Sequence, residues 1–380
     1  MLIGIDASRS TAGQRTGTEN YSLFLIRELL ASDSTHRFRL YFNRAPSPGL
    51  FPDGAESRVI PFPRLWTHLR LSWEMFNHGP DLLFVPSHVL PLYRPRRSVV
   101  TVHDLGYLYY PEAHTLTQNV YLRWSTRFNA RSANKVLADS EATRQDLVSR
   151  YQVAADRISV VYPGRDETLA PVDNPALLAE VRERYGLAES YLLYVGTLHP
   201  RKNLVRLVRA FGLVAGSPAA TFQSPVSNLQ LVLAGQKGWL YKDLLTEVRR
   251  LGLEDRVLLT GYVPKDDLAA LLSGAQAFIY PSLYEGFGLP VLEAMACGTP
   301  VVCSNVSSLP EVAGDAALLV DPLDVEAIAQ AILDLIADDS VGRELVARGY
   351  RQIECFSWRR CAQEALEVFE EVAGNSGAEE

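Results

Sequence analysis

The sequence predicts an α/β fold with two doubly wound domains, and two observations carry this prediction. First, short apolar runs rich in Val, Ile and Leu alternate with segments whose apolar residues recur three and four positions apart. This alternation is typical of buried parallel strands connected by helices. Second, the 380 residues contain thirteen such runs, more than one sheet of ordinary size holds. Two sheets, each with its own core, are therefore expected.

The expected strands follow one another along the whole chain. Runs such as LLFV and SVVTV show no polar alternation, which indicates strands that are covered on both faces. Between most runs lie helix-period segments such as NYSLFLIRELL and DDLAALLSGA. The expected strands are residues 2–6, 38–42, 58–62, 81–87, 98–104, 135–140, 158–164, 191–197, 229–235, 256–263, 277–282, 300–305 and 317–321.

The domain boundary is expected in residues 162–176, YPGRDETLAPVDNPA, because Pro, Asp and Gly gather there between a strand and a helix. This placement gives a first domain of residues 1–165 and a second of residues 166–356. The polar stretch 216–228 is interpreted as a surface insertion. The segment SWRRCAQEALEVFEEVA is expected to form a last amphipathic helix.

Composition indicates a soluble globular protein, with 47% hydrophobic and 21% charged residues. The N-terminal MLIGIDASRS begins directly with an apolar strand, so we expect no signal peptide. The chain contains no run of eighteen or more apolar residues, so we expect no membrane span. The four cysteines lack metal-binding or disulfide spacing, which favours free thiols in a reducing cytoplasm.

Charge is distributed unevenly along the chain, whose net charge is −7. Residues 1–165 hold 20 Lys and Arg against 14 Asp and Glu, whereas the remainder holds 17 against 30. A basic half can indicate a charged partner, although solubility alone also produces such a split. No recognition motif accompanies the charge, so we do not expect nucleic acid as a partner.

Two predicted helix faces in the first half of the chain suggest an anionic membrane surface as a partner. A basic face beside an aromatic one can bind anionic lipid, so docking on the inner-leaflet membrane surface is one hypothesis. A solvated face and a core-facing face are the alternative. The basic face comprises Arg123, Arg127, Arg131 and Lys135, and the apolar face comprises Trp66, Leu69, Trp73 and Phe76.

Residues 284–293, YEGFGLPVLE, follow an expected strand and begin an expected helix. Gly286 and Gly288 let the backbone approach a ligand, and the N–H groups at a helix start suit a phosphate. Glu285 and Glu293 suit neutral hydroxyls, for which an ionised carboxylate is a strong acceptor. A ligand with phosphate between two sets of hydroxyls has the layout of a nucleotide-sugar, in which a diphosphate joins a ribose to a hexose. A glycine-rich turn with a capping acid is the alternative.

The segment GTLHPRKN, residues 196–203, also lies between a strand and a helix of the second domain. Arg201 and Lys202 are adjacent cations at this junction and could meet a diphosphate. Solvated surface cations are the alternative for this segment alone. Two strand ends that carry complementary chemistry in one domain favour a binding site.

These segments resemble GT-B glycosyltransferases of family GT4, especially bacterial mannosyltransferase-like members. Four ordered blocks carry the resemblance: residues 3–21, 102–112, 196–203 and 258–322, the last with the family's E-x7-E pattern as Glu285 and Glu293. The resemblance implies two Rossmann-like domains facing a central cleft. It assigns acceptor binding to residues 1–165 with the last helix, about 357–380, and donor binding to residues 166–356.

The resemblance also implies residue roles in the second domain. Glu293 would hold the ribose hydroxyls, Glu285 a hydroxyl of the transferred sugar, and Arg201 with Lys202 the diphosphate. Some relatives carry a second arginine directly after the strand-end glycine, whereas Thr197 follows Gly196 here. Arg201 and Lys202 are therefore the expected cationic clamp. Backbone N–H groups of Phe287, Gly288 and Leu289 would assist, and Tyr262 and Val263 would border the base.

In the first domain, His103 and Asp104 end an expected strand. Histidine is readily tuned for proton transfer or hydroxyl recognition, and the resemblance places His103 close to the transferred sugar. We assign it to positioning and stabilising that sugar, with a backbone-bonded histidine as the alternative. Gly17 and Thr18, expected in the loop after the first strand, would allow close approach of the acceptor or diphosphate. Glu19 would orient a group there or cap a helix.

The expected enzyme is a retaining, metal-independent hexosyltransferase of the EC 2.4.1 type. It would move a hexose, with mannose from GDP-mannose favoured, to a glycan or lipid-linked acceptor in cell-surface polysaccharide or glycolipid synthesis in the cytoplasm. Fixed cations would stabilise the leaving diphosphate. No D-x-D motif is present, so no metal or other cofactor is expected; Asp139-Ser140-Glu141 is interpreted as a helix cap.

A sugar-nucleotide epimerase of GT-B type, which acts on the donor without an acceptor, is the main alternative. A glycosidase has no need of the Arg-Lys pair. A nicotinamide oxidoreductase is disfavoured because Val291 replaces the third glycine of its fingerprint. The base, the hexose, the acceptor and the oligomeric state stay open from the sequence.

Overall fold

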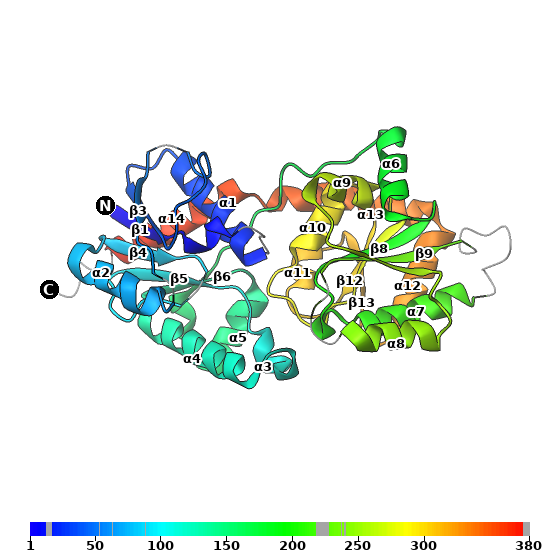
Figure 1. The fold of residues 1–380 in the computed structure, drawn as a ribbon, viewed down its shortest axis with the longest axis horizontal. Coiled ribbons are helices and arrows are strands. Elements are labelled where there is room, and N and C mark those ends of the chain that lie inside the picture. Colours follow the sequence, from blue (N-terminus) through cyan, green and yellow to red (C-terminus); the bar gives the residue numbers. More distant parts are fainter. Residues whose placement is uncertain are drawn as a thin grey trace. The chain divides into compact units, whose positions relative to one another are not determined.

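The computed structural model describes residues 1–12, 17–52, 54–62, 64–87, 89–217, 228–236, 238 and 241–374. They divide into one unit of Met1–Gly164 with Phe356–Glu380, and a second of Arg165–Cys355. Each unit holds a parallel sheet with helices around it (Figure 1). The predicted class of two doubly wound α/β domains is therefore confirmed. Each expected boundary lies one residue from the division in the structure.

The first unit contains a seven-stranded sheet in the order β3-β2-β1-β4-β5-β6-β7. Its strands are β1 (Leu2–Asp6), β2 (Arg37–Phe42), β3 (Glu56–Val59), β4 (Leu82–Val85), β5 (Ser98–Val102), β6 (Lys135–Ala138) and β7 (Ile158–Val160). Its helices are η1 (Ser8–Thr11), α1 (Gly17–Ala31), η2 (Thr67–Leu71), α2 (Ser72–His78), α3 (Gly106–Tyr109), η3 (Pro111–Ala113), α4 (Leu116–Ser132), α5 (Glu141–Tyr151), η4 (Ala155–Arg157) and α14 (Trp358–Gly374).

The second unit contains a six-stranded sheet in the order β10-β9-β8-β11-β12-β13. Its strands are β8 (Tyr191–Val195), β9 (Gln230–Ala234), β10 (Val257–Gly261), β11 (Ala277–Tyr280), β12 (Val301–Ser304) and β13 (Ala317–Val320). Its helices are α6 (Pro175–Tyr185), η5 (Pro200–Lys202), α7 (Leu204–Ala215), α8 (Tyr241–Arg250), α9 (Lys265–Ser273), α10 (Leu289–Ala296), α11 (Leu309–Ala313), α12 (Val325–Ala337), α13 (Asp339–Gln352) and η6 (Ile353–Cys355).

Every expected strand corresponds to a strand of the structure, but several end earlier than expected. β3 runs over residues 56–59 and not 58–62, because Pro61 has no N–H group for the ladder. β5 and β6 stop before the polar pairs His103-Asp104 and Asp139-Ser140, which leave the sheet as connections to helices. Most of the expected insertion at 216–228 lies outside the described residues.

The strand order reverses direction once in each sheet, between β1 and β4 and between β8 and β11. The loops that follow two such strands diverge toward opposite faces of the sheet, which leaves a crevice for ligands at the strands' carboxyl ends. In the second unit, these are the loops that begin at Gly196 and Pro281. The topology therefore brings the two sequence motifs GTLHPRKN and YEGFGLPVLE to one place.

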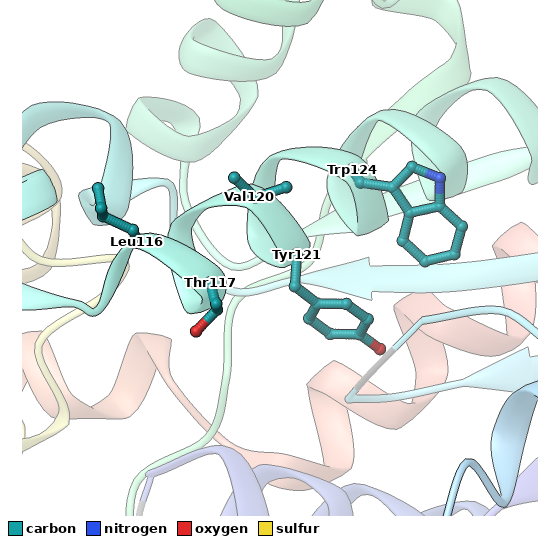
Figure 2. A pocket seen from close by; sticks show the side chains of 5 residues that line it. All are labelled: Leu116, Thr117, Val120, Tyr121 and Trp124. Atoms are coloured by element: carbon teal, nitrogen blue, oxygen red, sulfur yellow. The ribbon is translucent and has the colours of Figure 1, made fainter.

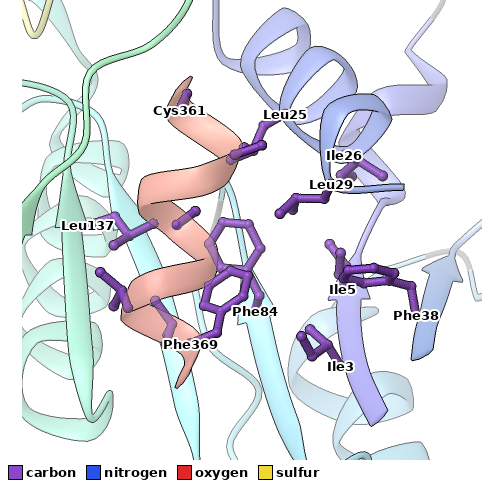
Figure 3. Close-up of a cluster of buried hydrophobic side chains, with 14 of the residues drawn as sticks. Ile3, Ile5, Leu25, Ile26, Leu29, Phe38, Phe84, Leu137, Cys361 and Phe369 are labelled. Carbon is purple, nitrogen blue, oxygen red and sulfur yellow. The ribbon is translucent and has the colours of Figure 1, made fainter. Parts of the chain in front are cut away.

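The last helix is part of the first unit's core. Figure 3 shows α14 beside α1 and against the strands of the first sheet, with Cys361 and Phe369 among core residues such as Leu25 and Phe84. Phe369 is fully buried, and its ring centroid lies 4.9 Å from that of Phe84. Within the described ranges, no helix is both long and apolar enough to cross a membrane.

Candidate active site

Three glycines end the neighbouring strands β8, β9 and β10. Gly196, Gly235 and Gly261 have φ values of 149°, 153° and 73°, a region that side chains disfavour. The N–H of Gly196 donates to the carbonyl of Ala234, and the N–H of Gly235 to that of Gly261, both at 2.8 Å. A Cβ atom on Gly235 would lie 1.9 Å from the carbonyl oxygen of Gly196. The three loops therefore start from one tightly packed edge.

The loop that carries the two cations is fastened to the residues after β11. Asn203 is buried with φ of 62°, and its Nδ2 donates to the carbonyls of Pro281 and Pro322 at 3.0 and 2.6 Å. The N–H of Leu283 donates to the carbonyl of Arg201 at 2.9 Å. The positions of the cations are thus fixed by the same backbone that presents Glu285.

Lys202 and Glu285 form an ion pair in this fastened region. Nζ of Lys202 lies 2.5 Å from Oε1 of Glu285 and 2.7 Å from the hydroxyl of Tyr280. The lysine nitrogen also lies 4.9 Å from the centroid of the Tyr280 ring. Burial opposes ionisation of Glu285, but the positive charges of Lys202 and Arg201 hold its pKa below the ordinary value. Glu285 is therefore a carboxylate at neutral pH.

Two serines that the sequence reading missed hold the backbone of YEGFGL. The hydroxyl of Ser307 accepts the N–H of Glu285 at 3.0 Å. The hydroxyl of Ser308 lies within hydrogen-bond distance of the carbonyls of Glu285 and Phe287, at 3.0 and 2.6 Å. Both serines follow β12, the neighbour of β11, which is the signal that could have identified them. Gly288 has φ of 123°, which a side chain would disfavour.

α10 begins directly after this turn. The backbone N–H groups of Gly288 and Leu289 donate to no other residue in the described part of the chain. Because the first N–H groups of a helix have no partner within it, this end is suited to an anion. Phe287 is buried and its side chain contributes to the turn's packing.

Glu293 lies on the second turn of α10 and is partly buried. Burial and the negative charge of Asp166 raise its pKa to about 7, although the positive charge of Lys265 opposes this shift. Asp166 and Lys265 pair with each other at 2.5 Å. Glu293 therefore changes its protonation state close to neutral pH.

The structure places the remaining predicted residues of the second unit on the same edge. Tyr262 is 58% exposed and directly follows Gly261, and Val263 is partly buried beside it. All predicted donor residues thus lie at the carboxyl ends of β8, β10 and β11 or in the helix that follows β11. They are Gly196, Arg201, Lys202, Tyr262, Val263, Glu285, Phe287, Gly288, Leu289 and Glu293.

In the first unit, His103 is held by a side chain and not only by backbone. Its Nδ1 lies 2.6 Å from Oδ2 of Asp139, and the ring of Tyr21 packs edge-on at 4.7 Å. Burial disfavours the charged imidazole, but the negative charges of Asp139 and Asp104 raise the pKa of His103 above its ordinary value. β5 and β6 are neighbours, which is why residues just past their ends meet.

The interpretation of Asp139-Ser140-Glu141 as a helix cap is therefore only partly right. Ser140 caps α5 by accepting the N–H of Thr143 at 3.1 Å, whereas Asp139 binds His103. Gly17 is the first residue of α1 and not part of a loop, and residues 13–16 before it lie outside the described residues. Glu19 lies in the first turn of α1, 3.7 Å from Arg9.

In the described residues, no three His, Cys, Asp or Glu side chains come together as a metal site. The four cysteines are unbonded, with Cys355 exposed and the other three buried. The expected absence of a metal requirement stays a prediction.

Comparison with known proteins gives the family. The model described as "Glycosyl transferases group 1" matches residues 180–352, and "Glycosyltransferase Family 4" matches residues 15–169. O-antigen chain mannosyltransferase B of Escherichia coli is 35% identical over 373 residues, which cover 93% of this chain and 96% of that protein. Serotype-specific mannosyltransferase WbdA of Escherichia coli is 31% identical over 74% of this chain, but only 34% of WbdA is covered.

Two solved structures have a fold similar to that of this chain. Sucrose-phosphate synthase from Thermosynechococcus elongatus has a TM-score of 0.74 at 23% identity, over 98% of this chain and 99% of that one. Anabaena Alr3699/HepE, solved in complex with UDP and glucose, has a TM-score of 0.73 at 19% identity, over 97% and 99%. With two family models in order along the chain and a near full-length relative, the chain belongs to glycosyltransferase family 4 and is a glycosyltransferase of GT-B fold.

Proposed function

We propose that the enzyme is a retaining, metal-independent mannosyltransferase that takes mannose from GDP-mannose. The acceptor is a glycan or lipid-linked saccharide in the synthesis of a cell-surface polysaccharide such as an O-antigen. The names of the most similar relatives support the sugar and the pathway class. The single observation that carries the proposal is the Lys202–Glu285 ion pair, fixed beside the start of α10.

The donor roles follow from the charges of the second unit. Arg201 and Lys202 bind the diphosphate together with the N–H groups of Gly288 and Leu289. Ionised Glu285 accepts hydrogen bonds from hydroxyls of the mannose, and Glu293 from the ribose. The exposed ring of Tyr262, next to Val263, offers an apolar surface to the base.

The proposed chemistry is a substitution at the anomeric carbon. The bond from this carbon to the diphosphate oxygen breaks, and a bond to the acceptor oxygen forms on the same face of the sugar. The acceptor hydroxyl gives its proton to the leaving diphosphate. Negative charge grows on the diphosphate during this step, and the fixed charges of Arg201 and Lys202 stabilise it without reorganisation.

His103 positions and stabilises the transferred sugar in this proposal. Asp139 engages Nδ1, so the other ring nitrogen is the one that can meet a sugar hydroxyl. The enzyme works in the cytoplasm, at the inner face of the membrane. Four unbonded cysteines agree with a reducing compartment. The epimerase alternative is not favoured, because the matched relatives are named as transferases.

A panel of nucleotide-sugars tests the donor. A ligand that binds only the native state raises the melting temperature, so GDP-mannose should raise it more than UDP-glucose, ADP-glucose or dTDP-glucose at equal concentration. Transfer to a synthetic mannosyl acceptor should give an α-mannoside by NMR. A β-mannoside would rule out retention, and conversion of the donor without acceptor would indicate an epimerase.

A further inference from the structure

Helix α4 exposes four large apolar side chains and buries several uncharged polar ones. Leu116, Val120, Tyr121 and Trp124 are between 41 and 85% exposed. They line an open groove of about 430 Å³ on the helix surface (Figure 2). A surface helix of a globular protein ordinarily shows the opposite arrangement. The buried residues of α4 are Asn119, Ser125, Thr126, Asn129 and Ala130.

Hydrogen bonds attach the buried face of α4 to the unit, together with apolar contacts of Leu122, Phe128 and Ala130 with the core. Nδ2 of Asn119 donates to the carbonyl of Pro111 at 2.7 Å, and Oδ1 of Asn129 accepts the N–H of Leu90 at 2.9 Å. The hydroxyl of Tyr107 donates to that of Thr126 at 2.8 Å. Since the buried face already holds the helix through these contacts, the exposed apolar residues are not needed to attach it. Large exposed apolar patches mark interaction sites.

The patch continues onto η2 and α2. Nε2 of His68 lies 3.2 Å from the hydroxyl of Tyr121, and the His68 ring centroid lies 5.5 Å from that of Trp124. Beyond His68, the ring of Phe76 contacts Tyr93 at 5.0 Å. We call the exposed set the aromatic face. It comprises Leu69, Trp73, Phe76, Tyr93, Leu116, Val120, Tyr121 and Trp124.

Trp66 does not belong to this face, contrary to the sequence-based expectation. It is buried, and its Nε1–H donates to the carbonyl of Ile60 at 2.7 Å. Lys135 does not belong to the basic face either. α4 ends at Ser132, and Lys135 begins β6 and pairs with Glu371 at 2.8 Å.

The aromatic face lies among basic segments. Residues 57–103 and 113–138 together contain ten Arg and Lys but only two acids, Glu74 and Asp81. Glu74 is buried, and Asp81 accepts the N–H of Leu2. On α4, Arg123, Arg127 and Arg131 are exposed and form no ion pair with any described residue. The positive charge of the first half of the chain is therefore concentrated here.

We propose that the aromatic face and the arginines of α4 dock on an anionic lipid surface. Trp and Tyr suit the boundary between headgroups and acyl chains, and arginine binds lipid phosphates. A second copy of this chain would fit the aromatic face less well, because a two-fold symmetric contact would place the arginines of the two copies against each other. The proposal rests on the proposed function for its purpose, which is to bring the enzyme to a lipid-linked acceptor.

Vesicle co-sedimentation at low salt tests the proposal with the full chain. The vesicles are phosphatidylcholine with and without one-fifth phosphatidylglycerol. The double variants Arg123→Gln/Arg127→Gln and Trp73→Ser/Trp124→Ser are compared with the control Arg249→Gln/Arg343→Gln, whose residues are exposed in the second unit. Each α4 arginine removed should lower the partition coefficient roughly fivefold. The tryptophan variant should also lose binding, and the control should keep it.

Activity on a short water-soluble acceptor separates this proposal from the proposed function. Full activity without vesicle binding would overturn the docking proposal and leave the enzyme assignment standing. Equal binding to neutral vesicles, or binding that survives both double variants, would also overturn it. A dimer that the tryptophan substitutions dissociate, in the absence of vesicle binding, would assign the face to a second copy. Circular dichroism of each variant shows that the fold is retained.

Discussion

Nζ of Lys202 lies 2.5 Å from Oε1 of Glu285, although 83 residues separate the two along the chain. Both side chains are mostly buried, at 13 and 9% exposed. Two charges buried this far are costly unless paired, so each depends on the other. The pair therefore contributes to the stability of the second unit while it holds a cation at the site proposed for the diphosphate.

Removing Lys202 should harm both stability and catalysis. Lys202→Met leaves Glu285 buried without its nearest counter-charge, which should lower the free energy of unfolding by about 3 kcal/mol at pH 7. Turnover should fall by about two to three orders of magnitude, because a stabilising charge on the leaving group is lost. Denaturant titration and steady-state kinetics measure the two effects.

The double variant Lys202→Met/Glu285→Gln separates these effects. It removes both charges, so most of the lost stability should return while turnover stays low. If the double variant is as unstable as the sum of the single variants, the pair is not coupled as the distance indicates.

The pKa of about 7 at Glu293 predicts pH-dependent donor binding. The carboxylate is the stronger acceptor, so affinity for the nucleotide should rise as pH increases through 7. Glu293→Gln should weaken binding roughly 10- to 100-fold at pH 8 and abolish this dependence. Isothermal titration calorimetry at pH 6 and pH 8 measures both, with the exposed Glu254→Gln as control.

Glu293 should also affect the stability of the ligand-free protein. Its folded pKa is raised, so stability present below pH 4.5 is lost as pH rises through 7. Glu293→Gln should therefore stabilise the protein by about 3 kcal/mol at pH 8, and by almost nothing near pH 4.5. A stabilisation that is equal at both pH values would show that the carboxylate is not the cause.

Asp139→Asn should lower the pKa of His103 by removing a buried negative charge. The raised pKa stabilises the fold fully below pH 6.5, and this stability is lost as pH rises through the folded value. The variant should therefore lose more stability at pH 6 than at pH 9. NMR of the His103 ring should show titration at lower pH, whereas Glu141→Gln should leave the titration unchanged.

Gly235→Ala should disrupt the edge from which the site loops start. The Cβ atom of the new alanine would overlap the carbonyl oxygen of Gly196. The melting temperature should therefore fall by more than the positive φ of this residue alone would cause. Gly252→Ala is the matched control, since its φ is 63° and a Cβ meets nothing within 4 Å. It should cost about 1 kcal/mol. Equal losses would contradict the close approach.

Dialysis against EDTA should leave the transfer rate unchanged, because the proposed mechanism stabilises the leaving group with arginine and lysine. The rate is measured with GDP-mannose before and after chelation. Loss of activity that Mg²⁺ or Mn²⁺ restores would contradict the metal-independent proposal.

The sequence was sufficient for the fold because strands covered on both faces consist of uninterrupted apolar residues, as in β4 and β11. It was also sufficient to group Arg201, Lys202, Glu285 and Glu293, because their motifs follow strands. The pairing of Asp139 with His103 could not be predicted, since it depends on β5 and β6 being neighbours.

The orientation of α4 could not be predicted either. The periodicity of its sequence shows two faces. Which of them is buried depends on hydrogen-bond partners outside the helix, such as Pro111 and Leu90. Hydrogen bonds with these partners allow the face that carries Asn119 and Asn129 to be buried. Ser307 and Ser308 were missed for a similar reason, because their role appears only when β12 is placed beside β11.

A crystal structure of the enzyme with GDP-mannose tests the central claim most directly. The account predicts the diphosphate in contact with Arg201 and Lys202 at the start of α10, with Glu293 on the ribose and Glu285 on the mannose. A donor bound elsewhere, or one whose diphosphate contacts neither cation, would contradict it.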